Sequence, residues 1–135
     1  MSQENVEIVM EAHAAVGRRD LDGFLLVWHP EAEYRAAVTQ VVEGEGGVFR
    51  GHDGMRRWWS DLDDLFDDLR TEVREVQDLG EAVLVVFVTH GRGKHSGLTI
   101  AEPLAQILTV REGKIIQARD YRSRAEALKA VGLSE

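Results

Sequence analysis

The spacing of hydrophobic residues differs between the two halves of this chain. In the first half, apolar side chains recur every three or four residues, which is the repeat of one face of an α-helix. The spacing predicts helices at about 3–18, 20–28 and 53–66, with Asp20 as the N-cap of the second. The third helix has the clearest apolar stripe, which consists of Met55, Trp58, Trp59, Leu62, Leu65, Phe66 and Leu69.

The second half contains long segments of the kind found in β-strands. We predict strands at 83–92, 98–110 and 114–122, joined by short turns at 94–97 and 111–113 that fit β-hairpins. The three strands would therefore form an antiparallel meander.

Shorter elements complete the pattern. Segments 31–38 and 71–79 have the composition of strands, 41–51 is a glycine-rich loop, and 125–131 is a short helix that ends before Gly132. Helices followed by antiparallel strands indicate an α+β fold, with helices covering one face of a strongly bent, mainly antiparallel sheet.

Alternation along the meander predicts which of its side chains share a face. Alanines stand on one face where Val, Ile or Leu would be more usual, and an ionisable residue stands at either end. A missing side chain beside a polar one indicates a pocket. This face is predicted to hold Val86, Val88, His90, Ala101, Ala105, Ile107, Ile116, Ala118, Asp120 and Arg122.

The opposite face of the meander is predicted to point away from the helices. It mixes apolar and polar residues, so we expect a second copy of the chain to bury it in a homodimer. The residues on which this expectation rests are Val85, Phe87, Leu104, Gln106 and Leu108.

Composition narrows the class of protein. The 135 residues, 44% of them hydrophobic and 30% charged, fit one globular domain spanning 1–135. The net charge of −8 argues against a nucleic-acid partner, because phosphate binding depends on Lys and Arg. The absence of cysteine excludes disulfides, thiolate metal sites and cysteine nucleophiles. The apolar runs are too short for a membrane partner and no signal peptide precedes them, so a cytoplasmic protein is expected.

Two residues are candidates for acid–base catalysis. Asp120 shares an apolar wall with Ala118, where desolvation would raise the pKa of its carboxyl group. The alternative is a structural ion pair with Arg119, Arg122 or a residue of a helix. His13 is a second candidate because it stands on the apolar stripe of the first helix, and its alternative role is a hydrogen-bonded core histidine.

Other residues are candidates for ligand binding rather than for chemistry. Tyr34 would supply a hydroxyl group, and His90 would stand at a pocket rim or at an exposed strand end. Asp64 and Asp68 lie one helical turn apart, but no histidine accompanies them, so we predict a solvated face, no metal and no cofactor. The ligand-binding set is Tyr34, Trp28, Trp59, Val86, His90, Ala105, Ala118 and Arg122.

Three passages carry a resemblance to a known family. They read WHPEAEY at 28–34, FRGHDGM at 49–55 and GKII at 113–116. In these passages and in the order of its elements the chain resembles the SnoaL-like branch of the nuclear transport factor 2-like superfamily, which includes ketosteroid isomerase, polyketide cyclases and limonene epoxide hydrolase. The resemblance implies a cone of three N-terminal helices and a short C-terminal helix with a bent sheet, an enclosed pocket and dimers formed through the sheet.

The chain departs from the catalytic patterns of these relatives. Ala36 and Ala105 stand where the isomerase has its proton-shuttling aspartate and its hydrogen-bond-donating aspartic acid, and Ala12 stands near its tyrosine. Ser123 replaces the aspartate of the cyclases, and Asp120 alone cannot supply the two aspartates of the epoxide hydrolase. The family's known mechanisms therefore do not transfer.

The sequence thus predicts a SnoaL-like protein that binds a small molecule in an internal, largely apolar pocket. Acid–base catalysis of the isomerase, cyclase or hydrolase type, on a small apolar or polycyclic compound, is one interpretation. The alternative is a non-catalytic ligand-binding or dimerisation module of the same fold.

Overall fold

The computed structural model describes residues 2–37 and 47–133. In these residues four helices accompany one six-stranded sheet. The elements are α1 (Ser2–Gly17), α2 (Leu21–Leu26), β1 (Trp28–Arg35), β2 (Val48–Arg50), α4 (Gly51–Leu65), β3 (Phe66–Asp78), β4 (Ala82–Gly93), β5 (Thr99–Arg111), β6 (Lys114–Tyr121) and α5 (Arg124–Ala130).

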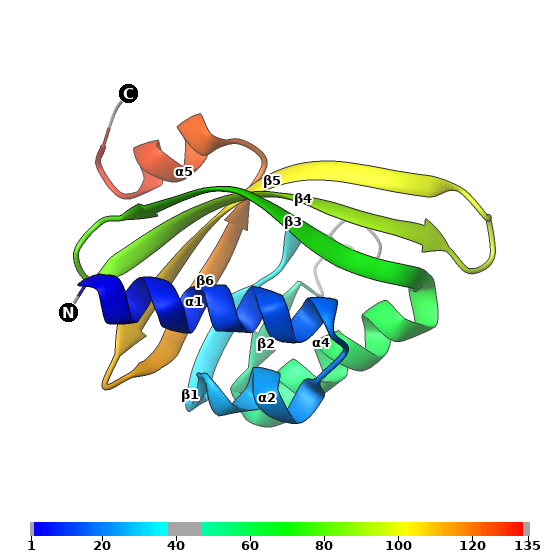
Figure 1. The fold of residues 1–135 in the computed structure, drawn as a ribbon, viewed down its shortest axis with the longest axis horizontal. Helices are drawn as coiled ribbons and strands as arrows, with labels where there is room; N and C mark the ends of the chain where they lie inside the picture. The colour runs from blue at the N-terminus through cyan, green and yellow to red at the C-terminus, as the bar shows by residue number, and fades with distance from the viewer. Residues whose placement is uncertain (1, 38–46, 134–135) are drawn as a thin grey trace.

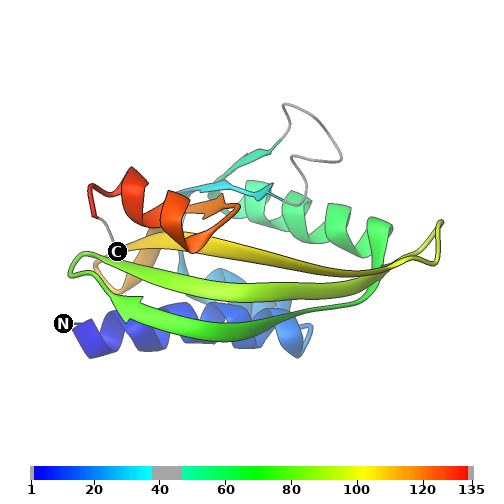
Figure 2. The same ribbon diagram turned by 90° about the horizontal axis from the view of Figure 1, so that it is seen from above.

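The sheet is mixed but mainly antiparallel. Its strand order is β2-β1-β6-β5-β4-β3, and β1 and β6 are the parallel pair. Figure 1 shows α1, α2 and α4 on one side of the curved sheet and α5 on the other. Figure 2 shows the hairpin of β4 and β5 extending beyond the helices. The α+β class is therefore confirmed. The prediction that the helices cover only one face of the sheet is wrong for α5, which lies on the second face.

Two apolar clusters match the two faces. The larger lies between the sheet and the three N-terminal helices, and its fully buried members include Val9, Phe49 and Met55. The smaller lies beneath α5, where Ala127 and Leu128 pack on β4 and β5. The apolar side of α5 therefore packs on the face of the sheet that α1, α2 and α4 do not cover.

The second helix is shorter than predicted. Asp20 is its N-cap as expected, since its carboxylate accepts a hydrogen bond from Gly23 N at 2.9 Å. The helix ends at Leu26, because Trp28 already pairs with Ile115 of β6. Pairing with a distant strand thus overrides a helical pattern that is local.

The glycine-rich segment 41–51 is a loop only in part. Val48–Arg50 form β2, which pairs with β1, and Gly51 already opens α4. Residues 41–46, like Val38 at the end of the predicted strand 31–38, lie outside the described residues.

The predicted pairing of the last hairpin is wrong by one residue. A regular hairpin around Arg111 and Lys114 would place Ala105 opposite Asp120. In the structure Val110 pairs with Ile115 but Thr109 pairs with Gln117, so Ile116 forms a β-bulge. Beyond the bulge, Asp120 is opposite Gln106. Since side chains alternate between faces, this shift exchanges the faces of the β5 side chains relative to β6.

The surface that predicted a homodimer lies inside the protein. Val85, Phe87, Leu104, Gln106 and Leu108 are buried on the face toward α1 and α4, each 5% exposed or less. They therefore offer nothing to a second copy. The homodimer itself stays a prediction, without this surface as its support.

Two glycines give a test of the packing of the helices. A Cβ at Gly54 of α4 would lie 3.0 Å from the backbone carbonyl carbon of Phe49, whereas a Cβ at Gly17 of α1 would meet nothing within 4 Å. We expect Gly54→Ala to lower the free energy of unfolding by about 1–3 kcal/mol despite its better helix propensity. Gly17→Ala should instead raise it by about 0.5 kcal/mol. Urea denaturation of both variants checks this, and a stabilised Gly54→Ala protein would contradict the close approach of α4 and β2.

Candidate functional site

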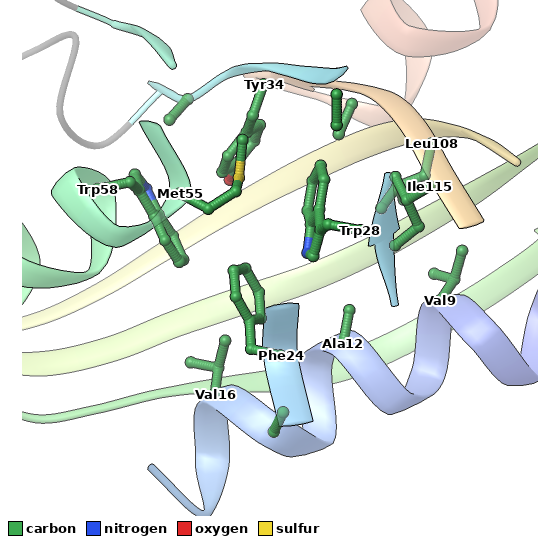
Figure 3. Close-up of a cluster of buried hydrophobic side chains, with 14 of the residues drawn as sticks. Val9, Ala12, Val16, Phe24, Trp28, Tyr34, Met55, Trp58, Leu108 and Ile115 are labelled. Atoms are coloured by element: carbon green, nitrogen blue, oxygen red, sulfur yellow. The ribbon is translucent and has the colours of Figure 1, made fainter. Parts of the chain in front are cut away.

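A cavity of about 50 Å³ lies between the sheet and helices α1, α2 and α4. Figure 3 shows Phe24, Trp28, Tyr34 and Trp58 side by side in the core around it. Aromatic and aliphatic side chains form most of its lining, and the polar ones come mainly from the strands. The lining residues are Ala12, His13, Val16, Phe24, Trp28, Tyr34, Ala36, Trp58, Leu62, Leu69, Thr71, Thr89, Leu104, Gln106, Leu108 and Asp120.

Asp120 reaches this cavity because of its position on β6. It is two residues after Ala118, which is fully buried in the main core, so strand alternation turns its side chain toward the helices. The bulge at Ile116 determines which residue of β5 lies opposite Asp120. This residue is Gln106 rather than Ala105.

Three donors hold the Asp120 carboxylate. Its Oδ2 accepts hydrogen bonds from the Tyr34 hydroxyl at 2.9 Å and from the backbone N–H of Ala37 at 3.0 Å. Its Oδ1 accepts one from Gln106 Nε2 at 2.8 Å. Among the described residues it makes no ion pair, since Arg119 lies over Tyr121 and Arg122 is exposed. The structural ion pair considered from the sequence is therefore absent from this part of the chain.

Burial nevertheless dominates the titration of this carboxyl group. Desolvation raises the pKa of Asp120 to about 6, and the bonds from Ala37, Gln106 and Tyr34 only partly oppose it. The nearby carboxylate and burial also raise the pKa of the Tyr34 hydroxyl, with burial the larger cause. At neutral pH the Tyr34 hydroxyl is therefore protonated and acts as a donor. The pKa of Asp120 is close enough to neutral pH for this carboxyl group to exchange a proton.

His13 of α1 lies at the other end of the same polar row. Its Nε2 is 3.0 Å from Gln106 Oε1 and its Nδ1 is 2.9 Å from Thr71 Oγ1. Its ring also packs edge-to-face with the Phe87 ring, at 5.1 Å between centroids. Burial lowers the pKa of His13 to about 4, with the bond to Gln106 opposing the shift. The imidazole is therefore neutral at pH 7.

The four polar side chains form a hydrogen-bonded row with a defined direction. Gln106 donates its N–H to Asp120, so its carbonyl oxygen is left to accept from His13 Nε2–H. His13 Nδ1 then accepts from the Thr71 hydroxyl. When Asp120 is protonated on Oδ1, the row can reverse, because the amide can rotate and the imidazole can change tautomer. The row can thus accommodate both protonation states of Asp120.

The structure separates the predicted site residues into two groups. Asp120, His13, Tyr34 and Trp28 line the same cavity. Ala118 is buried in the main core next to Asp120, and Trp59 packs against Phe24 at 5.2 Å between ring centroids, but neither lines the cavity.

The other predicted lining residues lie elsewhere, so their placement is corrected. Ala105 is buried in the cluster under α5, and Val86 packs against that cluster. His90 is on the same outer face, with its Nε2 2.9 Å from Glu72 Oε1. Arg122 is exposed after the end of β6. The wrong placement of Ala105, Val86 and His90 has one cause, the bulge at Ile116 that the sequence analysis did not predict. The bulge exchanges the two faces of β4 and β5 relative to Asp120.

Gln106 and Thr71 are the two members of the polar row that the sequence analysis did not place in the site. Gln106 is 5% exposed and stands between Leu104 and Leu108 on the same face of β5. A polar side chain between two bulky apolar ones at strand spacing is the signal that could have found it. Thr71 has no such signal, since β3 is an edge strand with alternating exposed residues.

No metal site accompanies the cavity in the described part of the chain. Within residues 2–37 and 47–133, no three His, Asp or Glu side chains are grouped so that they could hold a metal ion. Nor does any described helix have the length and hydrophobicity needed to span a membrane.

Comparisons with known proteins agree on the family. A family model described as a SnoaL-like domain matches residues 9–118. No curated protein matches the chain. Three similar crystal structures share the fold at low sequence identity. An NTF2-like protein of unknown function from Burkholderia pseudomallei has 21% identity and a TM-score of 0.79, with 93% of this chain and 95% of that one covered.

The other two structures are similar over almost their whole lengths. TerC, co-crystallised with polyporic acid, has 22% identity and a TM-score of 0.78, with 96% and 98% covered. A putative polyketide cyclase from Xanthomonas campestris has 20% identity and a TM-score of 0.73, with 96% and 98% covered. With the match over 9–118, the chain belongs to the SnoaL-like domain family, and its sheet and helices share the fold of an NTF2-like protein.

Proposed function

We propose that the cavity binds a small, largely apolar molecule and that Asp120 exchanges a proton with it. The observation that carries the proposal is the position of this carboxyl group, which faces the cavity while desolvation raises its pKa to about 6. A group with a pKa near the working pH can accept a proton in one step and return it in another.

The hydrogen bonds leave room for this exchange. Oδ2 accepts two bonds, from Tyr34 and Ala37, whereas Oδ1 accepts one, from Gln106. A carboxylate oxygen can accept two hydrogen bonds, so Oδ1 has one acceptor position left. A hydroxyl group or an acidic C–H of a bound molecule could occupy it. The reaction types that fit are isomerisation, cyclisation and hydrolysis, which all move a proton.

The apolar walls favour a compound with a planar apolar part. Phe24 of α2, Trp58 of α4 and Trp28 of β1 supply flat surfaces to the cavity. A ligand site usually has about 300–1,000 Å³, so at about 50 Å³ this cavity must widen to admit even one ring. The co-crystal of TerC with polyporic acid supports small-molecule binding by this fold.

A non-catalytic role is the second candidate. The polar row from Thr71 to Asp120 is hydrogen-bonded within the protein at every step, and the cavity is small. A row of this kind also fixes one packing of a core. In this interpretation the molecule is a ligand-binding or dimerisation module. A homodimer and a cytoplasmic location stay predictions under both interpretations.

The two candidates differ in the effect of Asp120→Asn. Because the polar row can reverse, we expect this variant to fold, with a stability close to that of wild type at pH 4 and greater than that of wild type, by up to about 3 kcal/mol, at pH 7. Any turnover found in a screen of small aromatic ketones, phenols and epoxides should fall by about a hundredfold or more. Asp64→Asn, the same change at an exposed position of α4, is the matched control and should keep full activity.

Activity and thermal-shift assays on the three proteins distinguish the two candidates. A turnover that survives in Asp120→Asn would contradict the catalytic role. Compounds that raise the melting temperature of all three proteins equally, with no turnover in any of them, would favour the non-catalytic module.

A further inference from the structure

One buried donor of the cavity has no partner. Trp28 is 2% exposed, and its indole Nε1–H is the one buried side-chain polar atom without a hydrogen bond in the described residues. Figure 3 shows the indole nitrogen on the edge of the ring toward Phe24. The polar row does not use this group. A buried donor left without an acceptor costs about 1–3 kcal/mol, so native proteins rarely keep one.

The surroundings of Trp28 explain why the protein itself offers no acceptor. Its ring lies 5.6 Å from Phe24 and 5.6 Å from Tyr34 between centroids. The Tyr34 hydroxyl donates to Asp120, 2.9 Å away. Aromatic rings therefore flank the indole, and the hydroxyl group of Tyr34 is already bound to Asp120.

We propose that Trp28 Nε1–H is the second polar anchor of the cavity and donates to a carbonyl oxygen of the ligand. This inference rests on the proposed function and narrows its substrate class. Tyr34 spans the space between the Trp28 ring and the Asp120 carboxylate. A planar ring lying beside Tyr34 would thus present one end to each group. The ligand class is a small aromatic or conjugated ring with a hydroxyl group at one end and a carbonyl oxygen at the other.

Each end of such a ligand meets a group of matching chemistry. Its hydroxyl donates to the open acceptor position of Asp120 Oδ1, and its carbonyl oxygen accepts from Trp28. Phe24 and Trp58 must separate for the ring to enter, since they stack at 5.5 Å between centroids beside Trp28. Removal of a proton from the hydroxyl by Asp120 would move negative charge through the conjugated ring to the carbonyl oxygen, where the N–H of Trp28 would stabilise it.

Three related compounds test the two anchors separately. 4-Hydroxyacetophenone carries both groups, 4-ethylphenol lacks the carbonyl, and acetophenone lacks the hydroxyl. We expect the wild-type protein to bind 4-hydroxyacetophenone at least about tenfold more tightly than either of the others, because each loses a bond to a buried polar group. Calorimetric titration measures the affinities. In ¹⁵N NMR the indole resonance of Trp28 should move downfield with 4-hydroxyacetophenone and stay in place with 4-ethylphenol.

Variants assign each preference to its residue. Trp28→Phe should abolish the preference over 4-ethylphenol and keep the preference over acetophenone, and Asp120→Asn should do the reverse. Trp59→Phe, a buried tryptophan outside the cavity lining, is the control and should keep both preferences.

Other outcomes separate the failure of this inference from the failure of the proposed function. Equal binding of 4-hydroxyacetophenone and 4-ethylphenol by the wild-type protein, with loss of both in Asp120→Asn, would overturn the role of Trp28 alone. A carbonyl preference that persists in Trp28→Phe would do the same. Absence of binding by all three compounds, or no preference that depends on Asp120, would overturn the role of Trp28 and the proposed ligand site together.

Discussion

Asp120→Asn and His13→Gln should change the pH dependence of stability in opposite directions. Burial raises the pKa of Asp120 from 3.8 to about 6, so folding disfavours its charged form. Protonated Asp120 therefore stabilises the folded state. This contribution to the free energy of unfolding is complete below pH 4 and is lost as the pH rises toward 6. Burial lowers the pKa of His13 from 6.5 to about 4, so its contribution is complete above pH 6.5 and is lost as the pH falls toward 4.

In the wild-type protein these two effects almost cancel. Between pH 4 and 6, folding protonates Asp120 and deprotonates His13, so the net uptake of protons by this pair is near zero. Asp120→Asn removes the pH dependence due to Asp120 and leaves that of His13. His13→Gln removes the pH dependence due to His13 and leaves that of Asp120. Relative to wild type, Asp120→Asn should gain up to about 3 kcal/mol as the pH rises from 4 to 6, and His13→Gln should lose about as much.

Urea denaturation at several pH values between 4 and 7 measures both slopes. The difference from wild type is the quantity to compare, because it removes the contributions of the surface carboxylates. The double variant serves as the control and should follow the wild-type profile closely. Parallel profiles of the wild-type protein and both single variants would show that these groups titrate normally, and would contradict their burial in the fold.

Gln106→Leu should be the most destabilising single change in the polar row. The substitution keeps the size of the side chain but removes the amide, which bonds to His13, to Asp120 at 2.8 Å and to the Tyr34 hydroxyl at 3.3 Å. A buried carboxylate oxygen and an imidazole N–H would lose their partners together. We expect the free energy of unfolding at pH 7 to fall by about 3 kcal/mol or more.

The same substitution should also raise the pKa of Asp120 above 6, since one of the bonds that favour its charged form is gone. NMR titration of the carboxyl carbon measures this directly. Gln117→Leu, on the exposed face of β6, is the matched control and should change stability by no more than about 0.5 kcal/mol. If Gln106→Leu and Gln117→Leu changed the free energy of unfolding by the same small amount, the hydrogen bonds of the polar row would not contribute to stability.

A double variant separates the role of the amide from that of its charged neighbour. In wild type, Gln106→Leu leaves the Asp120 carboxylate without its partner. The Asp120→Asn variant has no carboxylate at this position, so Gln106→Leu should lower the free energy of unfolding clearly less in that variant than in wild type. The difference between the two costs is the coupling energy of the pair. Costs that simply add would contradict a direct link between Gln106 and Asp120.

The fold was predictable from the sequence to the extent that it depends on local repeats. Three-to-four-residue spacing located α1 and α4, and alternation located β4, β5 and β6 almost to the residue. These patterns are local, because one face of a helix or strand must be apolar wherever it meets the core. The inward position of Asp120 was predictable for the same reason, since it follows from its distance to Ala118 along one strand.

The tertiary structure decided which residues Asp120 meets. The bulge at Ile116 inserts one residue into a hairpin, and no hydrophobic pattern marks it, yet it replaces Ala105 by Gln106 opposite the carboxylate. His13 and Thr71 join the site from α1 and β3, 58 residues apart in the chain. Periodicity gives the direction of a side chain within its own element. The partner of that side chain depends on strand register and on the packing of elements, which only the complete fold sets.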